Sequence, residues 1–157
     1  MGYAPFDLPA ASHSYLERAA SSLREATTTS DVPLRYASAH VAALRATAAL
    51  LAARATPTIG PRRGRQKNAW VLLAEVAPEF REWAAFFSAG AAKRAAAESG
   101  SRRAVTEREA DDLLRDAQTF LALVETTLGL AHQPVLPQHV DLAHRDLAHR
   151  DLAQRAG

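Results

Sequence analysis

Residues 34–55 read LRYASAHVAALRATAALLAARA. Apolar residues recur in this stretch at alternating spacings of three and four, which is the pattern of one apolar stripe along an α-helix. Ser30 or Asp31 can cap the N-terminus of this helix, and Pro33 suits its first turn. The stretch therefore predicts a long helix against which the rest of the chain packs. Its predicted inner face is Leu34, Ala37, Val41, Leu44, Ala48, Leu51 and Ala55.

The remainder of the chain adds further helical segments and no segment with the alternating pattern of an amphipathic strand. Ser12 is expected to cap the first helix, and Thr106 with Glu109 matches the capping box of the last one. Residues 56–66 contain two prolines and two glycines and are expected to form a loop. The predicted fold is all-α, an antiparallel up-and-down bundle of four to five helices. Besides residues 34–55, the expected helices are residues 12–28, 68–76, 78–98 and 106–130.

The composition is that of an ordinary single domain. The chain has 157 residues, enough to bury a sizeable core, but aromatic residues make up only 6% of it, so the core should depend on a few large side chains. There is no cysteine, which excludes disulfides, thiolate zinc sites and cysteine nucleophiles. We find no signal peptide and no apolar run near the roughly 20 residues that span a bilayer, so we expect a cytoplasmic protein without membrane contact.

Three regions are expected along the chain. Residues 1–11 form a loose leader, residues 12–131 form the helical domain, and residues 132–157 form a low-complexity tail. The tail repeats Asp-Leu-Ala-His-Arg twice and then Asp-Leu-Ala-Gln-Arg. A period of five advances about 140° per repeat on an α-helix, so the leucines of the repeats form no single stripe. We therefore expect the tail to be flexible and to lie outside the bundle.

Arg35 and His40 form the strongest catalytic candidate. A histidine can exchange a proton near neutral pH, and an arginine can hold a phosphate through its planar fork of donors. Together they suffice in principle for metal-independent RNA cleavage, with His40 as base towards the 2′-hydroxyl and Arg35 stabilising the charged phosphorane. Their spacing of five residues separates them by about 140° around one helix. A shared site therefore needs a distorted first turn, or a homodimer in which two such helices face each other. We expect the chain to form such a homodimer through the helix over residues 34–55.

Four segments of the chain resemble the HEPN (higher eukaryotes and prokaryotes nucleotide-binding) superfamily, and more closely a small actinobacterial branch of it. The resemblance covers roughly residues 13–131. It implies a helical bundle that often dimerises and is frequently a metal-independent endoribonuclease, with Arg35 in the phosphate role and His40 as base; some branches are RNA-binding or scaffolding modules without activity. Tyr36 stands where active members often have a small polar residue. The segments are RYASAHVAALR (35–45), NAWVLL (68–73), EWAAFF (82–87) and EADDLL (109–114).

Two interpretations of His40 stay open. As a catalytic base it would be exposed in a basic cleft at a two-fold axis. As a structural residue it would be packed in the core, and an apolar groove would be exposed at another place on the surface. The function is accordingly RNA binding with endoribonuclease activity, or a non-catalytic module that holds a protein partner or a nucleotide.

The densest basic cluster lies in the loop between the second and third helices. It could follow an RNA backbone with salt-sensitive affinity that ignores sequence, or it could be a solvated loop. We expect no cofactor and no metal: the acidic residues after Thr106 are explained by stabilisation of a helix N-terminus, and no phosphate-binding or dinucleotide motif is found. The cluster consists of Arg62, Arg63, Arg65 and Lys67.

Overall fold

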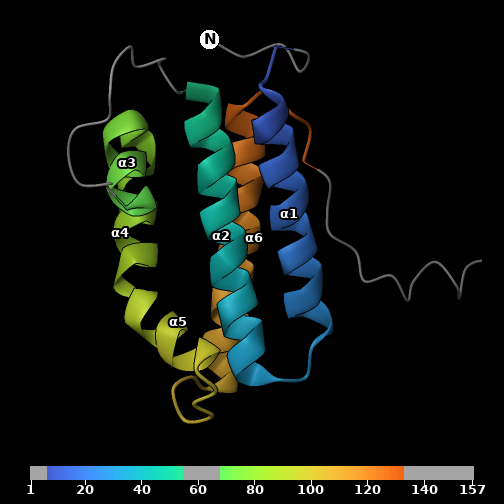
Figure 1. The fold of residues 1–157 in the computed structure, drawn as a ribbon, viewed down its shortest axis with the longest axis vertical. Helices are drawn as coiled ribbons and strands as arrows, with labels where there is room; N and C mark the ends of the chain where they lie inside the picture. Colours follow the sequence, from blue (N-terminus) through green and yellow to red (C-terminus); the bar gives the residue numbers. More distant parts are fainter. Residues whose placement is uncertain (1–6, 55–67, 133–157) are drawn as a thin grey trace, which may run out of the picture.

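The computed structural model describes residues 7–54 and 68–132, which form helices joined by short connections, with no strand among them (Figure 1). This confirms the predicted all-α fold. The first six residues, the loop 55–67 and the tail from residue 133 lie outside the described residues. The elements are α1 (Ala10–Thr28), α2 (Val32–Arg54), α3 (Ala69–Val76), the 3₁₀ turn η1 (Pro78–Phe80), α4 (Arg81–Ala89), α5 (Ala91–Glu98) and α6 (Glu107–Thr127).

The helices form a bundle with four columns. Three columns are the long helices α1, α2 and α6, and the fourth, the segmented column, consists of α3, α4 and α5 (Figure 1). Within it α3 packs beside α4, because Trp70 at the start of α3 stacks on Phe87 near the end of α4. Successive columns run in opposite directions, which confirms the up-and-down arrangement. The central element is α2, because it packs against α1, α3, α5 and α6. Within the two described ranges, no helix is long and apolar enough to cross a membrane.

The predicted inner stripe of α2 is wrong. Leu34 is 41% exposed, and Ala37 is the only predicted stripe residue that is buried; Ala55 lies outside the described residues. The reason is that neighbouring helices cover α2 on several sides, so its buried positions spread around most of its circumference and no single stripe marks them. Small alanines at these positions let the neighbouring backbones come close. The buried residues are Tyr36, Ala37, Ser38, Ala39, His40, Ala42, Ala43, Ala46, Thr47, Ala49 and Leu50.

Local signals at the helix ends were more reliable. The capping box of α6 is confirmed, since the Glu109 backbone N–H donates to Thr106 Oγ1 (3.1 Å) and the Thr106 N–H donates to Glu109 Oε2 (2.9 Å). Asp31 caps α2 by accepting from the Leu34 N–H (3.2 Å). The predicted N-cap at Ser12 is wrong. The helix α1 begins at Ala10, and the buried Ser12 hydroxyl donates to the Ala49 carbonyl of α2 (2.9 Å). This bond fastens α1 to the central helix.

The prediction of one continuous helix over residues 78–98 is also wrong. Pro78 begins a 3₁₀ turn, and the helix that follows is interrupted at Gly90, between α4 and α5. The Gly90 N–H donates to the Phe87 carbonyl (3.1 Å), one residue closer than in an α-helix, and helical bonding resumes at Arg94. Glycine weakens a helix interior by about 1 kcal/mol relative to alanine. A Cβ at Gly90 would also lie 3.0 Å from the Tyr36 hydroxyl, so a larger residue there would displace the end of the Tyr36 side chain.

The core is centred on Phe87, which is 1% exposed. Its ring stacks on those of Trp70 (5.2 Å between centroids) and Trp83 (5.9 Å), and meets Phe120 edge-on at 5.2 Å. These contacts join the segmented column to α6. As the composition suggested, a few large aromatic side chains supply the apolar area that the many alanines cannot supply.

Phe87→Ala should therefore destabilise the bundle strongly, by about 3–5 kcal/mol in the free energy of unfolding, because a fully buried ring is replaced by a cavity. The neighbouring Phe86 is 47% exposed, so Phe86→Ala is a matched control that should cost about 1 kcal/mol or less. Urea denaturation followed by circular dichroism measures both. Equal losses in the two variants would show that Phe87 is not the centre of the core.

Candidate functional site

His40 is completely buried between α2 and the segmented column. It is 0% exposed, and its Nε2 lies 3.0 Å from the Phe87 carbonyl oxygen. A carbonyl can only accept, so Nε2 carries the proton and donates. The imidazole also meets the rings of Trp70 (5.7 Å) and Phe87 (6.0 Å) edge-on. Its other nitrogen, Nδ1, has no hydrogen-bond partner within the described part of the chain.

The surroundings of His40 favour its neutral form. Burial lowers the pKa of His40, and this effect exceeds the opposite effect of the Phe87 carbonyl; Arg94 lowers the pKa further, while Glu98 raises it. Protonation would place a charge in the core and a second N–H donor on Nδ1, where no acceptor is found. Near neutral pH, the structural role of this imidazole is to hold the Phe87 carbonyl at the point where α4 ends.

Arg35 faces a different part of the bundle. Its Nη1 forms an ion pair with Asp111 Oδ1 of α6 (2.5 Å), and its Nη2 donates to the Thr29 carbonyl (3.2 Å). The Arg35 side chain is only 15% exposed. Arg35 thus links the start of α2 to α6 and to the turn after α1.

Within one chain, the structure does not bring Arg35 and His40 together. Arg35 points to α6 and His40 points to α4, as expected for a five-residue separation on a helix.

The acidic residues at the start of α6 form ion pairs with basic side chains: Asp111 pairs with Arg35, Glu109 pairs with Lys93 (2.8 Å), and Asp112 pairs with Arg115. In residues 7–54 and 68–132 we find no group of three or more His, Asp or Glu that could hold a metal ion.

The predicted basic cluster, Arg62, Arg63, Arg65 and Lys67, lies outside the described residues. The last described residue before it is Arg54, and the first after it is Asn68, which caps α3 by accepting from the Val71 N–H (3.0 Å). These four cations exceed the net charge of the whole chain, which is +2. The rest of the chain is therefore slightly acidic, and the excess positive charge of the whole chain is concentrated in this loop.

A pocket that the sequence did not indicate lies beside His40, at the break between α4 and α5. It has a volume of about 260 Å³, and its lining includes Tyr36, Phe86, Gly90 and Lys93. Periodicity could not reveal it, because it arises where α2, α4, α5 and α6 meet. The only local signal was a glycine inside an expected helix.

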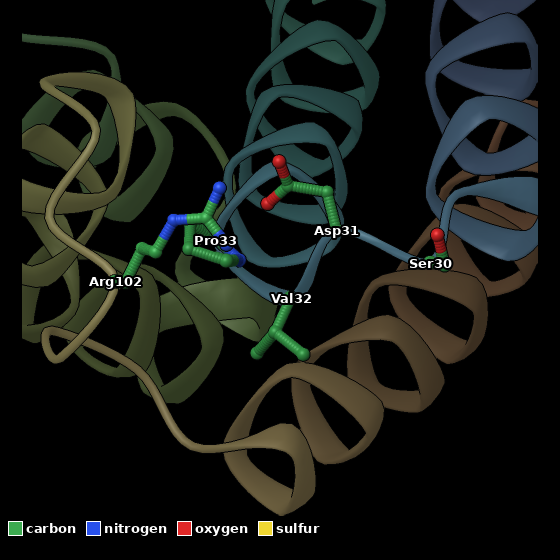
Figure 2. A pocket seen from close by; sticks show the side chains of 5 residues that line it. All are labelled: Ser30, Asp31, Val32, Pro33 and Arg102. Carbon is green, nitrogen blue, oxygen red and sulfur yellow. The ribbon is translucent and has the colours of Figure 1, made fainter.

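A second hollow lies at the start of α2 (Figure 2). It has a volume of about 450 Å³ and is lined by Ser30, Asp31, Val32, Pro33 and Arg102. Figure 2 shows Arg102 reaching from the connector before α6 to lie beside Pro33, while Val32 points towards α6. Both a carboxylate and a guanidinium line this hollow, so its charge does not select an anionic or a cationic ligand.

Comparison with known protein families places the chain. The profile of the family described as SAV_6107-like HEPN matches residues 26–125, from the end of α1 almost to the end of α6. No curated protein and no solved structure matches the chain significantly.

The burial of His40 predicts that the protein loses stability in mild acid. Because the folded-state pKa of His40 is lowered, the unfolded chain binds more protons than the folded chain as the pH falls through about 6.5, the ordinary histidine value. The free energy of unfolding should therefore fall between about pH 7 and pH 5 more steeply in the wild type than in His40→Gln. The glutamine amide can still donate to the Phe87 carbonyl, but it does not titrate.

Urea titrations across this pH range measure the difference. The exposed His13 offers a matched control, since His13→Gln also removes one imidazole from the chain. Identical pH profiles for the wild type and His40→Gln would contradict the prediction.

Proposed function

Because the chain belongs to the SAV_6107-like HEPN family, we propose that it is an RNA-binding HEPN module in which the histidine of α2 is structural and not catalytic. The observation that carries this proposal is the complete burial of His40. A general base must come within hydrogen-bond distance of the proton that it removes, directly or through one water. His40 is 0% exposed, and its protonated nitrogen is engaged by the Phe87 carbonyl.

The RNA-binding part of the proposal is supported by family membership and by the distribution of charge. Four cations follow one another closely in the loop 55–67 with no acidic residue between them. Basic residues grouped in this way release counterions from a phosphate backbone, which gives affinity that depends on salt and only weakly on sequence.

A metal-independent endoribonuclease at a dimer cleft is the second candidate. It is favoured by the Arg35-x4-His40 pair on α2 and by the apolar residues on the least buried side of that helix: Leu34 is exposed, and Val41, Leu44, Ala48 and Leu51 are half-buried. This face could meet a second copy of the chain.

The same face argues against a shared catalytic centre. Arg35 lies about 120° around the helix from Val41, so in a dimer across this stripe it would point away from the partner. Catalysis would also require the Arg35–Asp111 ion pair and the His40–Phe87 bond to open. We therefore place the non-catalytic module first and treat homodimerisation as a separate question for light scattering.

RNA binding should depend on the basic loop. In a filter-binding or fluorescence-anisotropy assay with single-stranded RNA, four phosphate contacts predict that affinity falls by about fifty-fold between 50 and 200 mM salt. Replacing Arg62, Arg63, Arg65 and Lys67 by glutamine should remove most of the affinity and of the salt dependence. The matched control replaces Arg18, Arg24, Arg81 and Arg108, four exposed cations spread over the bundle, in the same way. Equal losses in both variants would contradict the loop as the binding element.

The same preparation tests for cleavage. Incubation of a mixed RNA pool in EDTA with the wild type, His40→Ala and Arg35→Ala should give no cleavage that depends on either residue. Cleavage that persists in EDTA and disappears in both variants would overturn the non-catalytic proposal and establish the ribonuclease.

A further inference from the structure

The pocket at the break between α4 and α5 depends on the absence of a side chain. A Cβ at Gly90 would lie 3.0 Å from the Tyr36 hydroxyl and 3.7 Å from His40 Cδ2. Glycine therefore leaves room for the Tyr36 side chain to end in the pocket. The break in the helix and the pocket thus lie at the same residue.

Tyr36 brings an unused polar group to this space. The residue is 6% exposed, and its hydroxyl makes no hydrogen bond to any described residue. Burial raises the pKa of Tyr36, so the hydroxyl keeps its proton near neutral pH and can both donate and accept. Because Tyr36 lines the pocket, its hydroxyl can exchange solvent for a hydrogen bond to a ligand with a polar edge.

The remaining walls are mostly apolar. Phe87 and Leu113 line the interior, and the ring of Phe86, which is 47% exposed, lies at the opening. Lys93 is the only cation among the lining residues, and it is paired with Glu109 at 2.8 Å. The hydrogen bond between them raises the pKa of Lys93 and lowers that of Glu109, so both stay charged and the rim is neutral overall.

These features limit what can bind. A phosphate would gain little from an ammonium that Glu109 already neutralises. A purely aliphatic side chain would leave the Tyr36 hydroxyl without a partner. The volume of about 260 Å³ is just below the roughly 300 Å³ at which small-molecule sites usually begin, so there is room for one ring system.

We propose that this pocket binds a single unstacked nucleobase, with its face on the Phe86 ring and its polar edge on the Tyr36 hydroxyl. A base offers the two properties that the pocket requires, a flat π-face and hydrogen-bonding groups on its edge. The choice of a base over other flat rings rests on the RNA-binding function proposed above. In that case the basic loop would contact the backbone and the pocket would receive one base.

Free nucleosides test the pocket without the loop. Adenosine, guanosine, cytidine and uridine are titrated into ¹⁵N-labelled full-length protein, and the amide signals of Gly90 and Lys93 are followed. At least one nucleoside should give saturable shifts at these two amides. Because the rim is neutral, this affinity should change less than twofold between 50 and 200 mM salt, unlike the affinity for RNA.

Three variants assign the binding to the pocket. Tyr36→Phe removes only the hydroxyl and should weaken nucleoside binding about threefold to tenfold. Phe86→Ala should weaken it about tenfold through lost stacking, and Gly90→Ala should abolish saturable binding by filling the space. Leu123→Ala is the matched control for Phe86→Ala, because Leu123 is a similarly exposed apolar residue outside the pocket. It should leave the affinity unchanged.

The pocket proposal is overturned if no nucleoside shifts these amides at millimolar concentration, if Tyr36→Phe and Phe86→Ala bind like the wild type, or if N-acetyltyrosine amide binds more tightly than every nucleoside. RNA binding that depends on the loop would survive such a result, so failure of the pocket is distinguishable from failure of the proposed function. An oligonucleotide that shifts the same amides identifies RNA as the source of the base. Shifts with nucleosides alone support a free nucleoside as the ligand.

Discussion

The hydrogen bond from His40 Nε2 to the Phe87 carbonyl connects the central helix to the only column of the bundle that is broken. At the end of α4 the Phe87 carbonyl accepts from both the Gly90 N–H and the imidazole. This contact fixes the tautomer of His40, seats the imidazole among the aromatic rings of Trp70 and Phe87, and lies beside the break that opens the neighbouring pocket. The Nε2 side of the residue that first suggested chemistry thus has a structural role in the single chain, whereas its buried Nδ1 has no partner among the described residues.

How far the sequence predicted the structure depended on the range of the interactions involved. The capping box at Thr106 and the cap at Asp31 were predictable, because their partners lie within three residues. The all-α class followed from many such local signals. The inner face of α2 was not predictable from periodicity, since a helix covered on several sides has no single apolar stripe. The close approach of Tyr36 to Gly90 joins residues on different helices, which the sequence could not place together. Likewise, the sequence suggested Arg35 and His40 as a pair but could not give the partners Asp111 and Phe87, which are distant along the chain.

Charge in this protein is used mainly for internal connections. Arg35 with Asp111 and Lys93 with Glu109 tie α6 to α2 and to α5, and Arg54 with Glu79 ties the end of α2 to η1. The acidic group at the start of α6 therefore has structural partners. The rest of the chain has slightly more acidic than basic residues, so the loop 55–67 holds the excess positive charge of the chain. A polyanion would meet its main electrostatic attraction there, and the α2 motif contributes little to it.

The division of one column into short helices has a consequence for local stability. The helices α3, α4 and α5 have 8, 9 and 8 residues, whereas isolated helices shorter than about 12–15 residues are marginal in water. Each short helix therefore depends on its tertiary contacts, and α5 buries only Ala97. In native-state hydrogen exchange, α5 should behave as the least protected unit and open without unfolding of α1, α2 and α6. The wall of the Tyr36 pocket would then be the part of the bundle that reshapes at the lowest free-energy cost, while the long helices keep the fold.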